Sequence, residues 1–285
     1  MKNGAQRLTW EDIARFYRDG FVFKRGFFDP GELAPIEEAY HAGFAGQMSE
    51  WPDMDGVPLR ILSWAHEGDS MLARLPRMAR IVDAAEALLD EPCYHWHSKL
   101  VAKAPDAPGN VYWHAGQTTW YPRGARRPDI ITCCLAVTDS DRDNGCLQVI
   151  KGSHLLGRAV SEVINDEVYT TEALIADALD TYEVVDCEMK AGDALFFHAQ
   201  LLHGSPASVS RTRHRILVHM SYNAVSNSEA IVDPLHRFTA LERADDDSLA
   251  RRDYPSFCGD LKFIVGFGDD LKYLNASDGT VDDTP

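Results

Sequence analysis

Residues 191–205 read AGDALFFHAQLLHGS, and this stretch decides the fold of the chain. Ala191-Gly192-Asp193 is a turn signal, and Ala194–His198 is a short apolar run that predicts a buried strand. His203 lies in the next short run, directly before Gly204-Ser205. Short runs of this kind, separated by turns, are typical of an all-β sandwich or barrel rather than of a helical protein.

The same pattern extends through the middle of the chain. A helix is expected at Thr171–Leu179, and turns such as Asp143-Asn144-Gly145 separate the remaining runs. The expected strands are Tyr94–Lys103, Val111–His114, Ile130–Val137, Cys146–Ile150, Tyr182–Met189, Ala194–His198 and Arg215–Tyr222. Many short strands at this spacing predict a sandwich or a jelly-roll barrel.

The first 92 residues show helical periodicity instead. Thr9 can cap a helix with Asp12 reaching back, and Pro30–Met48 has apolar residues at helical spacing. Residues 70–90 repeat this pattern with a break at Pro76. We expect these helices to pack on the same core as the strands. The predicted organisation is a single domain over 1–285, with a helical part over 1–92, a jelly-roll core over about 93–225 and a C-terminal extension over 226–285.

Composition excludes several classes of function. Of the 285 residues, 45% are hydrophobic and 25% are charged, which is ordinary for a globular protein. The formal charge of −16 makes the chain a poor binder of nucleic acid polymers. No run of 18 apolar residues predicts a membrane span, and no secretory signal is visible. The six cysteines form no CxxC pair, so we expect reduced thiols and a cytoplasmic location.

Two histidines follow strand-like runs and are candidate metal ligands. Non-haem iron oxygenases hold Fe(II) with two histidines and one carboxylate. That carboxylate normally lies two residues after the first histidine, because residues i and i+2 of a strand share a face. His114 and His203 suit this pattern, but position i+2 is Gly116. Taken alone, two histidines among eleven more often have structural or surface roles.

Further motifs change this balance, and together they resemble the phytanoyl-CoA dioxygenase family of Fe(II)/2-oxoglutarate oxygenases. The resemblance extends from about Trp10 to Arg243. Its motifs are Trp113-His114, Asn144–His154, Gly192–His203, Gly204-Ser205, and Arg215 ahead of Tyr222-Asn223. The resemblance implies a mainly β fold with flanking helices and a double-stranded β-helix core, jelly-roll or cupin-like. It also implies Fe(II), 2-oxoglutarate and O2 as cofactor and cosubstrates, with His114 and His203 as the iron ligands.

The resemblance also implies which residues bind 2-oxoglutarate. Arg215 matches the arginine that holds the far carboxylate, a role that suits a planar guanidinium. Arg213 is the second candidate, since the preceding loop is one residue longer than usual. Ser205, two residues after His203, shares its strand face and could hydrogen-bond the same carboxylate. Five further cosubstrate-binding candidates, for each of which a packing or surface role is equally open, are Thr132, Cys134, His97, Lys99 and Lys103.

Gly116 resembles the position at which iron/2-oxoglutarate halogenases carry Ala or Gly. In that case a chloride or bromide ion takes the place of the carboxylate. The implied reaction chlorinates an unactivated aliphatic C–H bond and decarboxylates 2-oxoglutarate to succinate. A phytanoyl-CoA dioxygenase-like hydroxylase and a binding relative without catalysis are the alternatives, and another carboxylate ligand is the least favoured. Gly116→Asp is expected to restore a carboxylate ligand.

The segment after Gly116 supplies the substrate-binding candidates. Three arginines in a chain of charge −16 suggest a small anionic substrate, although a solvated loop is the plainer interpretation. A nucleoside monophosphate would combine phosphate pairing with aromatic stacking, and a substrate attached to a carrier protein is the second possibility. The candidates are Trp120, Tyr121, Arg123, Arg126 and Arg127.

Overall fold

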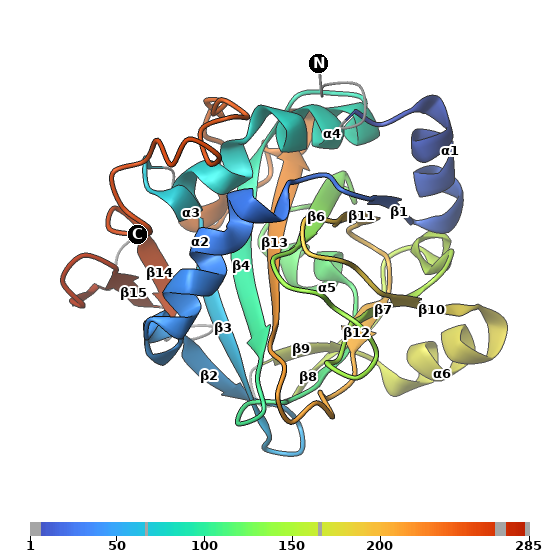
Figure 1. Cartoon of the computed structure of the whole chain (residues 1–285). Coiled ribbons are helices and arrows are strands. Elements are labelled where there is room, and N and C mark those ends of the chain that lie inside the picture. The colour runs from blue at the N-terminus through green and yellow to red at the C-terminus, as the bar shows by residue number, and fades with distance from the viewer. Residues whose placement is uncertain (1–6, 66–67, 165–166, 266–271, 283–285) are drawn as a thin grey trace.

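Two opposed β-sheets form the centre of the protein in a computed structural model (Figure 1). The structure describes residues 7–65, 68–164, 167–265 and 272–282. The larger sheet has the strand order β1-β11-β6-β13-β4-β3-β14-β15-β16, with β2 paired to β3. Its strands are β1 (Phe21–Lys24), β2 (Ser49–Pro52), β3 (Pro58–Trp64), β4 (Cys93–Lys103), β6 (Ile130–Ala136), β11 (Ala194–His198), β13 (Arg215–Ala224), β14 (Lys262–Val265), β15 (Lys272–Asn275) and β16 (Val281–Asp282).

The smaller sheet has the order β10-β7-β12-β5 and carries both candidate iron ligands. Its strands are β10 (Val184–Cys187), β7 (Leu147–Ile150), β12 (His203–Ser205) and β5 (Val111–His114). A separate hairpin pairs β8 (Ser161–Ile164) with β9 (Glu167–Thr170). Pairing within all these sheets is antiparallel. The prediction of a mainly β fold with flanking helices and a jelly-roll core is therefore confirmed.

Helices cover the outer face of the larger sheet (Figure 1). Thr9 forms the predicted capping box with Asp12 at the start of the first helix. The α-helices are α1 (Trp10–Asp19), α2 (Pro30–His41), α3 (Met71–Arg74), α4 (Ala79–Leu89), α5 (Gly116–Trp120) and α6 (Glu172–Thr181). Short 3-10 helices are η1 (Phe44–Gln47), η2 (Leu75–Arg77), η3 (Ser153–Leu156), η4 (Val225–Asn227) and η5 (Pro234–His236). No helix in the described ranges is long and apolar enough to cross a membrane.

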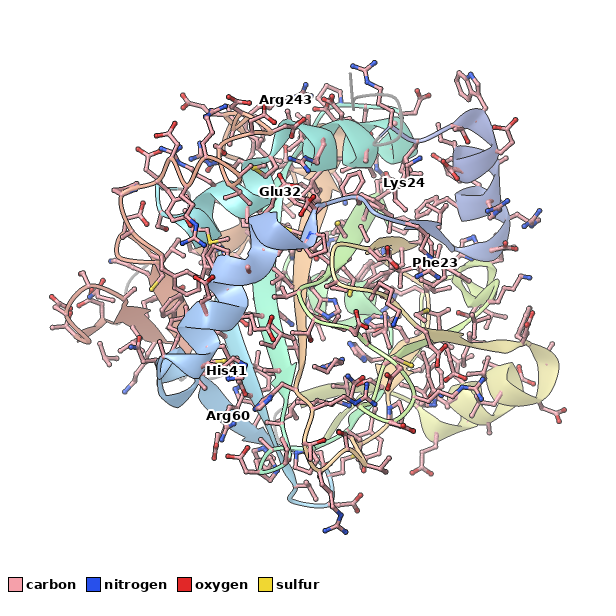
Figure 2. The ribbon with its side chains drawn as sticks, in the orientation of Figure 1. Phe23, Lys24, Glu32, His41, Arg60 and Arg243 are labelled. Atoms are coloured by element: carbon pink, nitrogen blue, oxygen red, sulfur yellow. The ribbon has the colours of Figure 1, made fainter. Side chains whose placement is uncertain are left out.

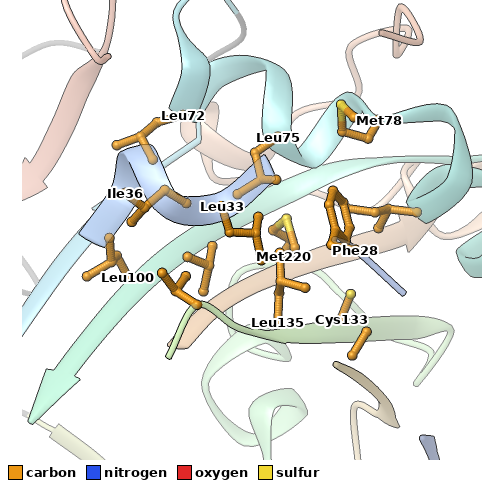
Figure 3. Packing of buried hydrophobic residues seen from close by; sticks show 14 of the residues in the cluster. Phe28, Leu33, Ile36, Leu72, Leu75, Met78, Leu100, Cys133, Leu135 and Met220 are labelled. Carbon is orange, nitrogen blue, oxygen red and sulfur yellow. The ribbon is translucent and has the colours of Figure 1, made fainter. Parts of the chain in front are cut away.

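Side-chain alternation on the strands divides the core into two layers. Odd-numbered residues of β6, such as Cys133 and Leu135, pack against Leu33 and Ile36 of α2 (Figure 3). Even-numbered residues, such as Cys134, face the smaller sheet. Because successive residues of a strand point to opposite faces, one strand serves both layers. The inner layer is where the candidate site lies.

Ion pairs hold α4 against its neighbours. Arg80 pairs with Glu32 of α2 at 2.8 Å and stacks over the ring of Phe28 at 4.2 Å. From the C-terminal extension, Arg243 pairs with Asp83 of α4 at 2.7 Å (Figure 2). These contacts join the N-terminal helices and the C-terminal segment to one another.

The helical prediction for residues 1–92 is only partly correct. Three strands, β1, β2 and β3, also lie there. β1 pairs with the distant strand β11 and β3 with β4, whereas β2 pairs with β3 in a local hairpin. No local sequence pattern predicts, for example, that Phe21–Lys24 pairs with β11. The helix predicted over Pro30–Met48 ends at His41, because Gly43 adopts a φ of 110° that breaks it. The C-terminal extension, which was predicted to lie outside the jelly-roll core, adds β14, β15 and β16 to the larger sheet.

Candidate active site

His114 and His203 lie opposite each other on neighbouring strands of the smaller sheet. β5 and β12 are antiparallel, and His203 pairs directly with His114 in their register. The centroids of the two imidazole rings are 4.2 Å apart. Two residues separated by 88 positions of intervening chain are thus side by side, as expected for ligands of one metal ion.

Backbone hydrogen bonds orient both imidazoles in the same way. His114 Nδ1 lies 2.8 Å from the carbonyl oxygen of Tyr112, and His203 Nδ1 lies 2.9 Å from that of Leu201. Each Nδ1–H therefore donates to the backbone, which leaves the lone pair on Nε2 free for a metal. Burial lowers the pKa of both histidines, so both rings are neutral at pH 7. This donor pair fits Fe(II).

A carboxylate does not complete this pair among the described residues, which contain no group of three His, Cys, Asp or Glu side chains able to hold a metal. Gly116, the position expected to bear the carboxylate, begins α5. The indole of Trp120 lies against it, so that a Cβ at residue 116 would approach Trp120 Cη2 to 2.5 Å. The indole therefore occupies the space of any side chain at this position.

Arg215 is a buried cation that lacks a partner for most of its guanidinium. Its side chain is 1% exposed, and no described residue accepts a hydrogen bond from Nε or Nη2. Burial lowers its pKa to about 10. The hydroxyl of Ser205 is likewise buried without a partner among the described residues. A carboxylate supplied by a small molecule would satisfy such donors, so this part of the site fits 2-oxoglutarate.

Lys103 is a second buried basic side chain, next to Arg215. It pairs directly with Arg215 in the register of β4 and β13, and its Nζ donates to the carbonyl oxygens of Ser205 and Pro206. Burial, followed by repulsion from Arg215, lowers its pKa to about 6. Arg213, the alternative to Arg215, lies exposed on the surface with Nη2 3.0 Å from Asp141. The buried geometry thus favours Arg215 as the cosubstrate residue.

Thr132 and Cys134 lie on the same inner face as Arg215. Thr132 Oγ1 is 2.9 Å from Ser221 Oγ, and Cys134 Sγ is 3.8 Å from His219 Nε2. Sequence reasoning did not single out Ser221 and His219, although both have the parity of Arg215 on its strand. Burial lowers the pKa of His219 to about 3, with Arg215 as the next cause. Strand alternation alone was sufficient to find these two residues.

His97 and Lys99 lie on the inner face of β4, directly opposite Ser221 and His219 of the antiparallel strand β13. His97 Nδ1 lies 3.3 Å from His236 Nε2, and His236 Nδ1 lies 2.9 Å from Asp233 Oδ2. His236, which the sequence analysis did not identify, comes from the C-terminal extension. The imidazole ring of His97 packs edge-on against the indole ring of Trp120, with ring centroids 5.6 Å apart.

The three arginines of the predicted substrate segment have different surroundings. Arg123 pairs with Asp233 at 3.2 Å, and Arg127 pairs with Asp129 at 2.7 Å. Arg126 instead lies over the ring of Tyr121, with the guanidinium carbon 4.9 Å from the ring centroid. Two of the three charges are therefore neutralised within the protein.

Arg158 joins Arg126 at the same aromatic ring, with its guanidinium carbon 4.2 Å from the centroid of Tyr121. Both arginines are exposed, and no carboxylate of the described ranges forms an ion pair with either. Arg158 was not predicted, because it lies far from the other arginines in the sequence. The pair forms a cationic surface patch, Tyr121/Arg126/Arg158, just beyond α5.

Comparisons with known proteins give one consistent result. A family profile described as Phytanoyl-CoA dioxygenase (PhyH) matches residues 16–216. The Ectoine dioxygenase of Sphingopyxis alaskensis is 27% identical over 87% of this chain and 85% of its own length. The L-proline trans-4-hydroxylase of Streptomyces griseoviridis is 28% identical over 60% of this chain and 70% of its own length.

A solved structure shares the fold. EctD from S. alaskensis in its apoform superposes with a TM-score of 0.68 at 24% identity, covering 86% of this chain and 90% of EctD. Other crystal structures of EctD contain bound Fe, or 2-oxoglutarate with 5-hydroxyectoine.

Proposed function

This chain belongs to the phytanoyl-CoA dioxygenase family, and from that membership we propose that it is an oxygenase dependent on Fe(II), 2-oxoglutarate and O2. The neutral, oriented imidazoles of His114 and His203 would hold the iron. Arg215 and Ser205 would hold the far carboxylate of 2-oxoglutarate, because both present buried donors that find no partner among the residues that the structure describes. When bound, iron and 2-oxoglutarate would together activate O2, and O2 would supply the oxidising power to break an unactivated C–H bond.

The more specific proposal is that the enzyme halogenates the substrate carbon with chloride or bromide. This proposal rests on Gly116. The residue offers no ligand, and no third metal-binding side chain joins the histidines in the described residues. A carboxylate here would both fill a ligand position and repel a second anion. Its replacement by glycine removes both obstacles to a halide. Buried Arg215 adds positive charge on the facing sheet.

Hydroxylation is the second candidate, and the relatives favour it. The two relatives reported above are a dioxygenase and a hydroxylase by name. In this alternative the protein performs the family's oxygen transfer with only two protein ligands. The comparisons thus favour the hydroxylase, whereas the residue at position 116 favours the halogenase.

The substrate is proposed to be a small anion, with a nucleoside monophosphate as the first choice. The Tyr121/Arg126/Arg158 patch supports this, because it combines an aromatic ring with two guanidinium groups that form no ion pair with a described carboxylate. Arg123 and Arg127 contribute less, since each is already paired with a carboxylate. A substrate carried on an acidic partner protein would use the same patch.

Product analysis separates these possibilities. The protein is loaded with Fe(II) and 2-oxoglutarate without O2, and a weak visible charge-transfer band is expected. O2 is then admitted with chloride, with bromide or without halide, using nucleoside monophosphates, ectoine and L-proline as test compounds. A product with the chlorine isotope pair supports halogenation, whereas a purely hydroxylated product at saturating chloride overturns it in favour of the alternative. Failure to form the band overturns the oxygenase assignment itself.

A further inference from the structure

Gly116 has no backbone reason to be glycine. It lies at the start of α5 and is absent from the glycines with positive φ. Alanine is normally preferred to glycine within a helix by about 1 kcal/mol. A glycine here must therefore be explained by its surroundings.

Trp120 supplies that explanation. It lies four residues after Gly116 on the same short helix, and helical side chains lean back toward the N-terminus onto the preceding turn. A Cβ at residue 116 would lie 2.5 Å from Cη2, 2.8 Å from Cζ3 and 2.9 Å from Cζ2 of the indole. All three distances are shorter than carbon–carbon contact allows.

The indole is held in this place by its neighbours. Trp120 is 7% exposed and packs against Trp96, with ring centroids 6.3 Å apart, and against His97. Trp96 in turn stacks on His236 with centroids 4.2 Å apart. His236 also forms the hydrogen bond with His97 that is described above. The ring of Trp120 cannot swing away without disturbing this cluster.

We propose that Trp120 is a positioning residue that keeps position 116 free of any side chain, and so prevents a protein carboxylate from joining His114 and His203. This rests on the proposed function, because position 116 matters only if the two histidines bind iron. It corrects the expectation that Gly116→Asp alone restores a carboxylate ligand. Two substitutions are needed, one to supply the carboxylate and one to remove the indole.

A double-mutant cycle on the metal-free protein tests the steric half of the proposal. Gly116→Ala is expected to lower the thermal unfolding midpoint, against the helix preference, when Trp120 is present. In a Trp120→Leu background the same change should leave the midpoint unchanged or raise it. Gly46→Ala is the control, because Gly46 also lies in a short helix and a Cβ there has open space. An equal loss in both backgrounds, or a rise in the wild type, overturns the proposal.

The cycle can also be interpreted when one of the variants does not fold. If Gly116→Ala does not fold but Gly116→Ala/Trp120→Leu does, the rescue supports the proposal. If Trp120→Leu does not fold, Trp120→Phe replaces it, since phenylalanine also lacks the three contact atoms. Absence of rescue by Trp120→Phe then overturns the proposal.

Anaerobic Fe(II) titration tests the ligand half. Gly116→Asp should bind Fe(II) no more tightly than the wild type, whereas Gly116→Asp/Trp120→Leu should bind it more tightly than Trp120→Leu. A Gly116→Asp single variant that gains as much affinity as the double variant overturns the role of Trp120. Neither measurement depends on the product, so failure of halogenation and failure of this inference are distinguishable.

Discussion

Lys103 and Arg215 are directly paired neighbours on β4 and β13, and both are basic side chains buried in the interior, of which Arg215 carries the charge at pH 7. Each is 1% exposed, and no described carboxylate forms an ion pair with either. Burying unpaired charge costs several kcal/mol, which a fold retains only where a ligand uses it. The pair therefore couples the stability of the ligand-free protein to the binding of a dianion.

Arg215→Met is expected to separate stability from binding. In the ligand-free protein the change should raise the free energy of unfolding by about 1–4 kcal/mol, because it removes an unpaired buried charge. Binding of 2-oxoglutarate should weaken by about 2–5 kcal/mol. Urea unfolding and anaerobic 2-oxoglutarate titration measure the two effects. Arg213→Met is the matched control and should change both little; if it weakens 2-oxoglutarate binding while Arg215→Met does not, the assignment is wrong.

The lowered pKa of Lys103 predicts how the stability of the ligand-free protein changes with pH. Its folded pKa of about 6 lies below the ordinary 10.5, so the unfolded chain binds more protons between these values. Stability of the ligand-free protein should therefore rise with pH through this window, by at most about 1.4 kcal/mol per pH unit from this residue. Urea unfolding at several pH values measures the slope. Lys103→Met should flatten it, and an unchanged slope in that variant contradicts the prediction.

His114→Ala and His203→Ala should each abolish the visible charge-transfer band formed with Fe(II) and 2-oxoglutarate. Because burial lowers the pKa of both histidines, protons should compete poorly with the metal, and wild-type Fe(II) binding should persist at pH 6. Anaerobic spectroscopic titration at pH 6 and 7.5 measures both effects. His198→Ala, which removes a histidine outside the pair, should retain the band. Retention of the band by His114→Ala would exclude it as a ligand.

Arg126→Gln/Arg158→Gln should lower kcat/KM for a nucleoside monophosphate by roughly threefold to tenfold, the size expected for exposed charge pairs. The corresponding nucleoside should be affected much less. Steady-state kinetics with both compounds measure the difference. Arg123→Gln/Arg127→Gln is the control, since these arginines already pair with Asp233 and Asp129. An equal effect on nucleotide and nucleoside would argue against phosphate recognition by this patch.

Local sequence patterns predicted much of this arrangement. The Thr9 capping box, the break at Pro76 and the strands at Val111–His114 and Ala194–His198 all follow from residues near one another in the chain. Period-two alternation also placed Thr132 and Cys134 on the inner face of β6, whereas Arg215 was assigned by the resemblance to the family. Such features are predictable because neighbouring residues alone determine capping, turns and strand faces.

Contacts between distant residues decided the rest. Strands β1 and β3 form only because β11 and β4 offer edges to pair with, and β14 then adds to β3. The neutralisation of Arg123 by Asp233 and the approach of His236 to His97 both depend on the C-terminal extension folding back. Composition could not reveal these pairings, since each charge finds its partner only in three dimensions.

The sequence by itself determined which chemistry is available: two histidines after short strands, an arginine on the last core strand, and glycine where a carboxylate is usual. Only the tertiary structure decided how these groups act together. It paired His114 with His203 across two strands, buried Arg215 with no described partner for Nε and Nη2, and placed the Trp120 indole over Gly116. The reason is physical, because residue type sets what a side chain can do, whereas packing sets its partners, its pKa and the space beside it.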